Sequence, residues 1–206
     1  MKTVIHAAAI SLLVFCEATL GSTLCTVSGD NYIVNADFTE RSRSDNAKHW
    51  TGIQHAGESS FERVFDGDVL QIIKIGSQPW FLLRQKLHAQ QLLLAGKKVA
   101  FSAEIKLDMQ PPAIYMAFKV GGGLQLTAKS KSSNKILLRS TLDHEPHMGK
   151  SDWQEVQVVV RLPKKAGVID LDILHQADGQ LSIRRPSLRL VDESEGPCKL
   201  TPRVKS

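Results

Sequence analysis

The chain has 206 residues, of which 42% are hydrophobic and 23% charged, and its formal net charge is +5 at pH 7. This composition excludes a disordered or collagen-like chain, and the length fits one domain of roughly 100–200 residues rather than a multidomain enzyme. The positive charge either favours an acidic partner or serves solubility alone. Nucleic acid is not expected as that partner, because the sequence has no basic helix, RRM motif or zinc-finger spacing.

The N-terminus has the features of a signal peptide over residues 1–22. Lys2 gives a positive start, residues 7–15 (AAAISLLVF) form an apolar run, and the small residues Gly21 and Ser22 follow. The apolar run is too short to cross a bilayer, and no later stretch is long enough. We therefore expect residues 23–206 to form one exported domain, secreted, periplasmic or extracellular, with no transmembrane segment. A buried first helix and a lipoprotein acylated at Cys16 are the alternatives.

Two cysteines remain in the expected mature chain, Cys25 and Cys198, and they lie near its two ends. An oxidising compartment favours a disulfide between them, which would close a loop of roughly 170 residues and bring the ends of the domain together. Two free thiols are the alternative. The wide separation is unlike a CxxC redox motif or a zinc knuckle.

Alternation of apolar and polar residues predicts a series of short strands with turn residues between them. The clearest stretch is 97–107 (KKVAFSAEIKL), in which Val99, Phe101 and Ile105 share one face. The predicted strands are 32–38, 49–55, 60–65, 69–75, 80–87, 97–107, 113–120, 124–129, 135–140, 153–162, 167–174 and 181–191, and glycines 121–123 are a predicted turn. So many short strands predict an all-β fold, a two-sheet antiparallel β-sandwich of the jelly-roll type.

Several short segments follow one another in a familiar order. They are residues 35–38 (NADF) with Trp50, 80–85 (WFLLRQ), 95–103 (AGKKVAFSA), Trp153 with its valine strand, and 181–188 (LSIRRPSL). Together, over about residues 30–191, they resemble carbohydrate-binding modules of the family 4/9 type, a branch of the galactose-binding-like jelly rolls. The resemblance implies glycan binding. It also implies a structural calcium held by an Asp of the last strand, but Arg184 and Arg185 stand there, so we expect no cofactor and no metal site, with a structural calcium as the alternative.

A sugar site needs aromatic rings for the C–H faces of the sugar and planar polar side chains for its hydroxyls, within a concave surface. Alternation along 80–87 and 113–120 provides such groups on the faces expected to meet solvent, and the polar set of strand 97–107 adds a carboxylate. The candidate ligand-binding residues are Trp80, Arg84, Tyr115, Lys119, Glu104 and Gln85. The first five are expected on one sheet face. Gln85 is included because it matches a Gln of the family, although alternation places it with the core.

Other residues suggest chemistry less strongly. Asp170 and Asp172 lie on one face of a predicted strand, where we expect a solvated surface rather than a glycosidase pair. Residues 143–147 (DHEPH) are expected to be a solvated loop rather than a metal site. We therefore predict a secreted, non-catalytic domain that binds a polysaccharide or glycan, with acidic glycans among the candidates. The alternatives are a glycan-cleaving enzyme, with lyase chemistry at Tyr115, Lys119 and Arg84, and a structural or adhesive envelope protein.

Overall fold

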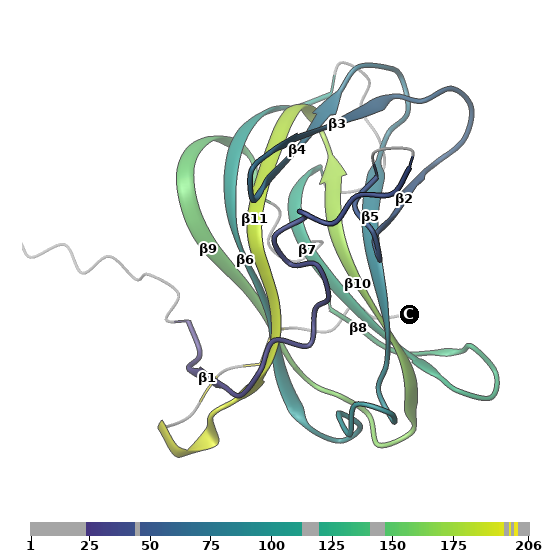
Figure 1. Cartoon of the computed structure of the whole chain (residues 1–206), viewed down its shortest axis with the longest axis vertical. Helices are drawn as coiled ribbons and strands as arrows, with labels where there is room; N and C mark the ends of the chain where they lie inside the picture. Colours follow the sequence, from purple (N-terminus) through teal and green to yellow (C-terminus); the bar gives the residue numbers. More distant parts are fainter. Residues whose placement is uncertain are drawn as a thin grey trace, which may run out of the picture.

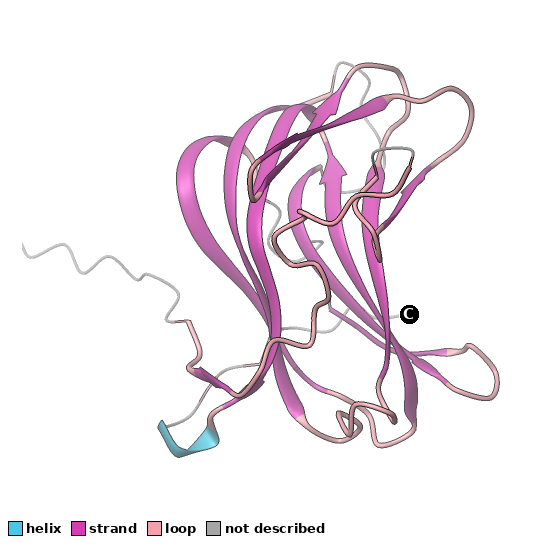
Figure 2. Cartoon of the chain, in the orientation of Figure 1, coloured by secondary structure: helices cyan, strands magenta, loops and turns pink. Residues whose placement is uncertain are grey.

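Two antiparallel sheets face each other across one core (Figure 1). The computed structural model describes residues 24–43, 46–112, 120–140, 147–195, 198, 200 and 201, so the expected signal peptide lies outside the described residues. Within those residues, a short 3-10 turn η1 (Glu193–Glu195) is the only helical element (Figure 2), and no helix there is long and apolar enough to cross a membrane. The prediction of an all-β sandwich of the jelly-roll type is confirmed.

The first sheet has the strand order β3-β4-β11-β6-β9, and the short β1 pairs with β11. The strands of this sheet are β1 (Val27–Ser28), β3 (Phe61–Asp66), β4 (Val69–Lys74), β6 (Lys98–Gln110), β9 (Gly149–Arg161) and β11 (Asp178–Val191). The second sheet has the order β2-β5-β10-β7-β8. Its strands are β2 (Thr51–Gln54), β5 (Phe81–His88), β7 (Gly121–Ser130), β8 (Ile136–Ser140) and β10 (Ala166–Gln176).

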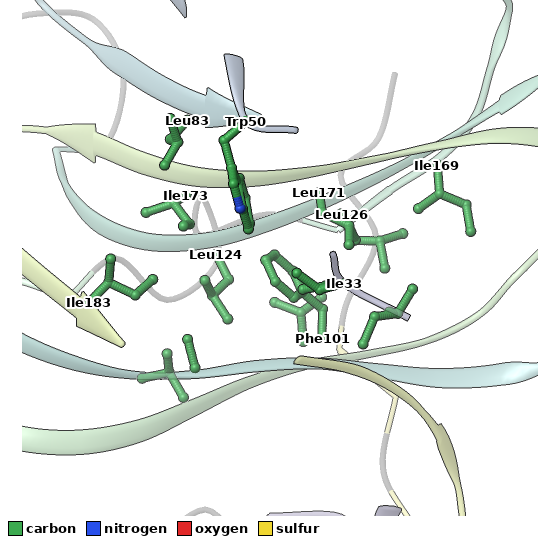
Figure 3. Packing of buried hydrophobic residues seen from close by; sticks show 14 of the residues in the cluster. Ile33, Trp50, Leu83, Phe101, Leu124, Leu126, Ile169, Leu171, Ile173 and Ile183 are labelled. Atoms are coloured by element: carbon green, nitrogen blue, oxygen red, sulfur yellow. The ribbon is translucent and has the colours of Figure 1, made fainter. Parts of the chain in front are cut away.

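The core lies between the two sheets, where alternate residues of the long strands point inward (Figure 3). Phe101 on β6 and Ile183 on β11 face Leu126 on β7 and Leu171 on β10, and all four side chains are fully buried. Burying a side chain of this size contributes about 1.5–3 kcal/mol. The period-two pattern of 97–107 therefore correctly placed Phe101 among the inward-facing residues of its strand.

The Cys25–Cys198 disulfide is present and joins the two ends of the domain. The two Cα atoms are 5.5 Å apart, although 173 residues separate the cysteines in the sequence. The bond packs on the outer side of the first sheet, next to Ala100, Val159 and Val191. The predicted disulfide is thus confirmed, and it holds both terminal segments against the same sheet.

The predicted strand at 32–38 is wrong, because this segment forms turns that cross from the first sheet to the second. Asn35 and Phe38 have left-handed backbone conformations, with φ of 52° and 55°, which a strand does not allow. The backbone carbonyl of Asn35 accepts a hydrogen bond of 3.1 Å from Trp50 Nε1, and Phe38 packs on the Trp50 ring at 5.5 Å. The NADF segment and Trp50 therefore build the core.

Glycines 121–123 do not form the predicted turn. They are the first residues of β7 and pair with β10, with Gly122 opposite His175. A Cβ atom at Gly122 would lie 2.9 Å from Met109 Sδ on β6, so a glycine here lets the two sheets approach closely. The predicted strand at 113–120 lies almost entirely outside the described residues.

Candidate functional site

Polar side chains form two rows across the outer face of the second sheet, on the side away from the core. The strand register places Arg84 opposite both Thr51 and Asp172, and Asp172 opposite Gln125. In the next row the register follows the order Lys86, Asp170, Thr127 and Arg139. These two rows bring together residues that are far apart in the sequence, because β5, β10, β7 and β8 are neighbours in this sheet.

Asp172 is the centre of the first row. Its Oδ1 accepts a hydrogen bond of 2.6 Å from Arg84 Nε, and its Oδ2 accepts one of 2.9 Å from Arg84 Nη2. Gln125 Nε2 donates to the same Oδ2 at 2.7 Å. Arg84 therefore holds the carboxylate through both oxygens, which is the strongest geometry available to this pair. Because the Asp172 hydrogen bond stabilises the charged guanidinium, the pKa of Arg84 is raised, against the opposing effect of burial.

Asp170 is the centre of the second row. Its Oδ2 lies 2.5 Å from Lys129 Nζ and 3.6 Å from Arg84 Nη1. Asp170 and Asp172 are both 0% exposed, so the expectation that they form a solvated strand face is wrong. Carboxylates are buried to this extent only when cations compensate for the lost hydration, and here Arg84 and Lys129 do so.

Some polar atoms of the second row have no hydrogen-bond partner among the described residues. They include Thr127 Oγ1, Asp170 Oδ1 and Arg139 Nε, and each of these atoms is buried, whereas Asp170 Oδ2 is held by Lys129. A buried polar atom without a hydrogen bond is costly, and such atoms are usually satisfied by water or by a ligand. The second row is therefore rich in hydrogen-bonding capacity that the described protein atoms do not use.

Arg84 connects these rows to a hollow at the edge of the sheet. The hollow has a volume of about 430 Å³ and lies between β2, β5 and the segments that contain Val34 and His49. Its lining residues are Val34, His49, Thr51, Ile53, Arg84, Gln85, Lys86 and Leu87. Three of these residues are apolar and five are polar or charged, and the volume lies in the range of small-molecule sites in proteins.

The structure places two predicted site residues, Trp80 and Gln85, at different depths. Trp80 directly precedes β5, is half-buried, and meets the His55 ring edge-on at 6.1 Å. Gln85 is 2% exposed, and its amide pairs with both the N–H and the carbonyl of Val34, at 2.9 and 2.8 Å. Gln85 therefore anchors the crossing segment to β5, as the alternation of the sequence indicated.

Glu104 lies on the opposite side of the molecule from Arg84, so the prediction of one sheet face that contains both residues is wrong. Glu104 belongs to β6 of the first sheet, where its Oε2 accepts hydrogen bonds of 2.9 and 2.6 Å from Arg184. Its Oε1 accepts one of 2.9 Å from Arg185. The Arg184 hydrogen bonds are the largest cause of the lowered pKa of Glu104. Arg184 also lies over the Trp153 ring, 4.3 Å from its centroid.

Two of the predicted site residues, Tyr115 and Lys119, and most of the 143–147 loop lie outside the described residues. In the part of the chain that is described, no group of three or more His, Cys, Asp or Glu side chains is placed to hold a metal ion. The sequence analysis missed Gln125, Thr127 and Lys129 as site residues. Their alternation on 124–129 was visible, but no local signal indicated that β7 lies next to β10.

Comparisons with known proteins agree with this architecture. No protein-family model matches the chain, and no curated protein matches its sequence. Among solved structures, one described as "CBM4 structure and function" is 16% identical over 77% of this chain and 99% of its own, with a TM-score of 0.50. The C-terminal family 22 carbohydrate binding module of Clostridium thermocellum Xyn10B is 13% identical over 78% and 94%, with a TM-score of 0.46.

The enzymatically active domain of bacteriophage CBA120 tailspike protein 4 is also similar, at 12% identity over 78% of this chain and a TM-score of 0.49. The match covers only 21% of the tailspike chain. At such identities the likeness defines the fold alone. The protein therefore has a jelly-roll β-sandwich fold similar to that of the carbohydrate-binding module with the TM-score of 0.50, and no family model assigns it to family 4/9.

Proposed function

We propose that the protein is an exported, non-catalytic glycan-binding domain whose site is the outer face of the second sheet. The observation that carries this proposal is the hollow at Arg84, because it joins a preformed concave surface to a buried, rigid row of polar groups. Groups that are held in place before binding lose little conformational entropy when a ligand arrives. The fold shared with carbohydrate-binding modules supports the same proposal.

The chemistry of this face suits a sugar chain. Arg84 and Gln125 present N–H donors, Thr51 presents a hydroxyl, and the wall at Ile53 is apolar. Trp80 does not line the hollow; it directly precedes β5, four residues before Arg84, and an extended chain of that length spans about 13 Å. We infer that the Trp80 ring packs on a sugar ring at one end of the site while Arg84 binds hydroxyl or carboxylate groups at the other. The ligand is then an oligosaccharide rather than a single sugar.

The charges on this face favour an acidic sugar. Lys86, Lys129, Arg84 and Arg139 provide four cations, against the two carboxylates of Asp170 and Asp172 in the same rows. Both carboxylates are buried against cations, an arrangement that supports binding rather than hydrolysis of a glycosidic bond. The disulfide supports export, since such bonds persist in oxidising compartments.

A glycan array probed with residues 23–206 tests this proposal, followed by titration calorimetry of the best oligosaccharide. The matched pair of variants is Trp80→Ala on the proposed face and Trp153→Ala on the outer face of the other sheet. We expect Trp80→Ala to weaken binding about tenfold or more, since stacked aromatic groups contribute most of the affinity at such sites. Trp153→Ala should leave it unchanged. A blank array, or loss of binding only in Trp153→Ala, would refute the proposal.

A further inference from the structure

Three turns lie at the lower end of the sandwich in Figure 1, where the β7–β8 turn projects to the right of the other two. They are the β5–β6 connection at 89–97, the β7–β8 turn at 131–135 and the β9–β10 turn at 162–165. Leu162 N–H donates to the Lys97 carbonyl at 2.8 Å, and Ala89 N–H donates to the Gly167 carbonyl at 3.0 Å. A Cβ atom at Gly96 would lie 3.3 Å from Lys164 Cγ. Gly167, just after the β9–β10 turn, lies so close to Lys131 that a Cβ atom there would clash with it, so the β7–β8 turn begins beside the other two turns.

This surface is strongly basic. The stretches 86–98, 128–140 and 156–169 hold ten of the 26 lysines and arginines of the chain and none of its 21 acidic residues. Three of the ten, Lys86, Lys129 and Arg139, belong to the polar rows of the second sheet described above, which leaves seven for this end. Five exposed lysines lie on or beside the turns, and no ion pair joins any of them to a described acidic residue. We call these five residues the basic end: Lys97, Lys131, Lys135, Lys164 and Lys165.

Among the other exposed lysines that the structure describes, only Lys86, which lines the hollow, likewise has no ion pair to a described acidic residue. Lys48, Lys106 and Lys150 are also exposed, and each of them pairs with an acidic residue, at 3.8, 3.4 and 3.3 Å. At the basic end the neighbouring acid, Glu193, is already paired with Arg161 at 2.5 Å. The positive potential of the five lysines is therefore not neutralised by described acidic residues nearby.

Uncompensated positive charge of this kind attracts polyanions, and the neighbouring residues distinguish between the possible ones. No Phe, Trp or Tyr lies within 86–98, 128–140 or 156–169, so there is no stacking platform for nucleic-acid bases. Leu93, at 79% exposure, is the only large apolar side chain of the β5–β6 connection that is clearly exposed. A single such side chain offers too little apolar surface for insertion into a membrane. Serines and an asparagine occupy the β7–β8 turn, and such groups can hydrogen-bond to a sugar chain.

We propose that the basic end is a second binding surface, specific for acidic polysaccharides and separate from the hollow at Arg84. It binds by the charge of its lysines rather than by shape, so a sulfated or uronate-rich chain suits it whatever the sequence of its sugars. Such binding releases counterions from the polymer and therefore weakens steeply as salt is added. Binding at the basic end is independent of binding at the hollow, so the protein would hold an acidic polysaccharide there whatever the hollow binds.

The test compares two triple variants that remove the same net charge. Lys131, Lys164 and Lys165 are changed to serine in the first variant, and Lys48, Lys106 and Lys150 are changed to serine in the control. Binding of a defined heparin fragment is measured by calorimetry between 50 and 300 mM salt, because charge-driven binding changes by orders of magnitude over this range. Neutral dextran serves as a second control. All six residues are exposed, so both variants are expected to fold.

We expect the first variant to bind heparin about tenfold to a hundredfold more weakly at low salt and with a shallower salt dependence, while the control changes less than about threefold. Equal losses in both variants would mean that net charge alone matters, and this result would overturn the proposal. So would undiminished binding in the first variant. Binding to phosphatidylserine vesicles without binding to heparin would assign the surface to a membrane and would also overturn it.

Discussion

Replacing Asp172 by alanine removes the carboxylate at the centre of the first polar row. Asp172 is fully buried and accepts two hydrogen bonds from Arg84 and one from Gln125. Deleting one partner of a buried ion pair leaves an uncompensated charge, and this costs about 3–5 kcal/mol. In a domain of this size such a loss lowers the melting temperature by about 10 °C. Urea unfolding of wild type and Asp172→Ala, followed by tryptophan fluorescence, measures the difference directly.

A double variant separates the stability of this pair from its role in binding. Arg84→Met combined with Asp172→Leu replaces the ion pair by apolar side chains of similar size, a change that is often neutral or stabilising. We expect the double variant to regain most of the free energy of unfolding that Asp172→Ala loses, but to lose glycan binding. If Asp172→Ala costs less than about 1 kcal/mol, the ion pair is not the buried, rigid element described above.

Three further predictions concern stability. Replacing Cys25 and Cys198 by serine should lower the free energy of unfolding by about 4–5 kcal/mol, because the disulfide closes a long loop and so reduces the entropy of the unfolded chain. Urea unfolding measures this loss, and an unchanged unfolding curve would contradict the prediction. Burial lowers the pKa of His175 from 6.5 to about 4, so the unfolded chain binds more protons than the folded chain between these pH values. The free energy of unfolding should therefore fall by about 3 kcal/mol as the pH drops from 6.5 to 4. Urea unfolding at each pH measures this fall, which should be smaller in His175→Gln. Gln85→Leu should cost about 2–3 kcal/mol by leaving both Val34 backbone groups unpaired, with faster hydrogen exchange at the Val34 amide, and slow exchange there would argue against the contact.

The local pattern of the sequence predicted the strands and the direction of their side chains. Alternation along β5 correctly placed Arg84 outside and Gln85 inside. It succeeded because side-chain direction in a strand is fixed by period two, whichever sheet the strand joins. Alternation wrongly predicted a strand at 32–38, where Asn35 and Phe38 have positive φ values. Turns of this kind can space their apolar residues much as a strand does.

The site itself depends on pairings between distant strands, and a local pattern cannot supply them. Alternation puts Arg84 and Glu104 on the outer sides of their strands, but it does not show that β5 and β6 belong to different sheets. Asp172 was expected in solvent because a charged residue on an outer strand face is usually solvated. Its burial depends on Arg84, which is 88 residues away in the sequence. This contact exists only once β5 and β10 have paired.

The central claim, that the outer face of the second sheet is the glycan site, is tested most directly by a crystal structure of the protein with the oligosaccharide selected by the array. We expect sugar rings in the hollow with a hydroxyl or carboxylate within hydrogen-bond distance of Arg84, and a further ring of the same chain beyond the hollow against Trp80. A sugar chain seated instead on the first sheet, in the hollow of about 460 Å³ beside Glu104 and Ser102, would contradict it.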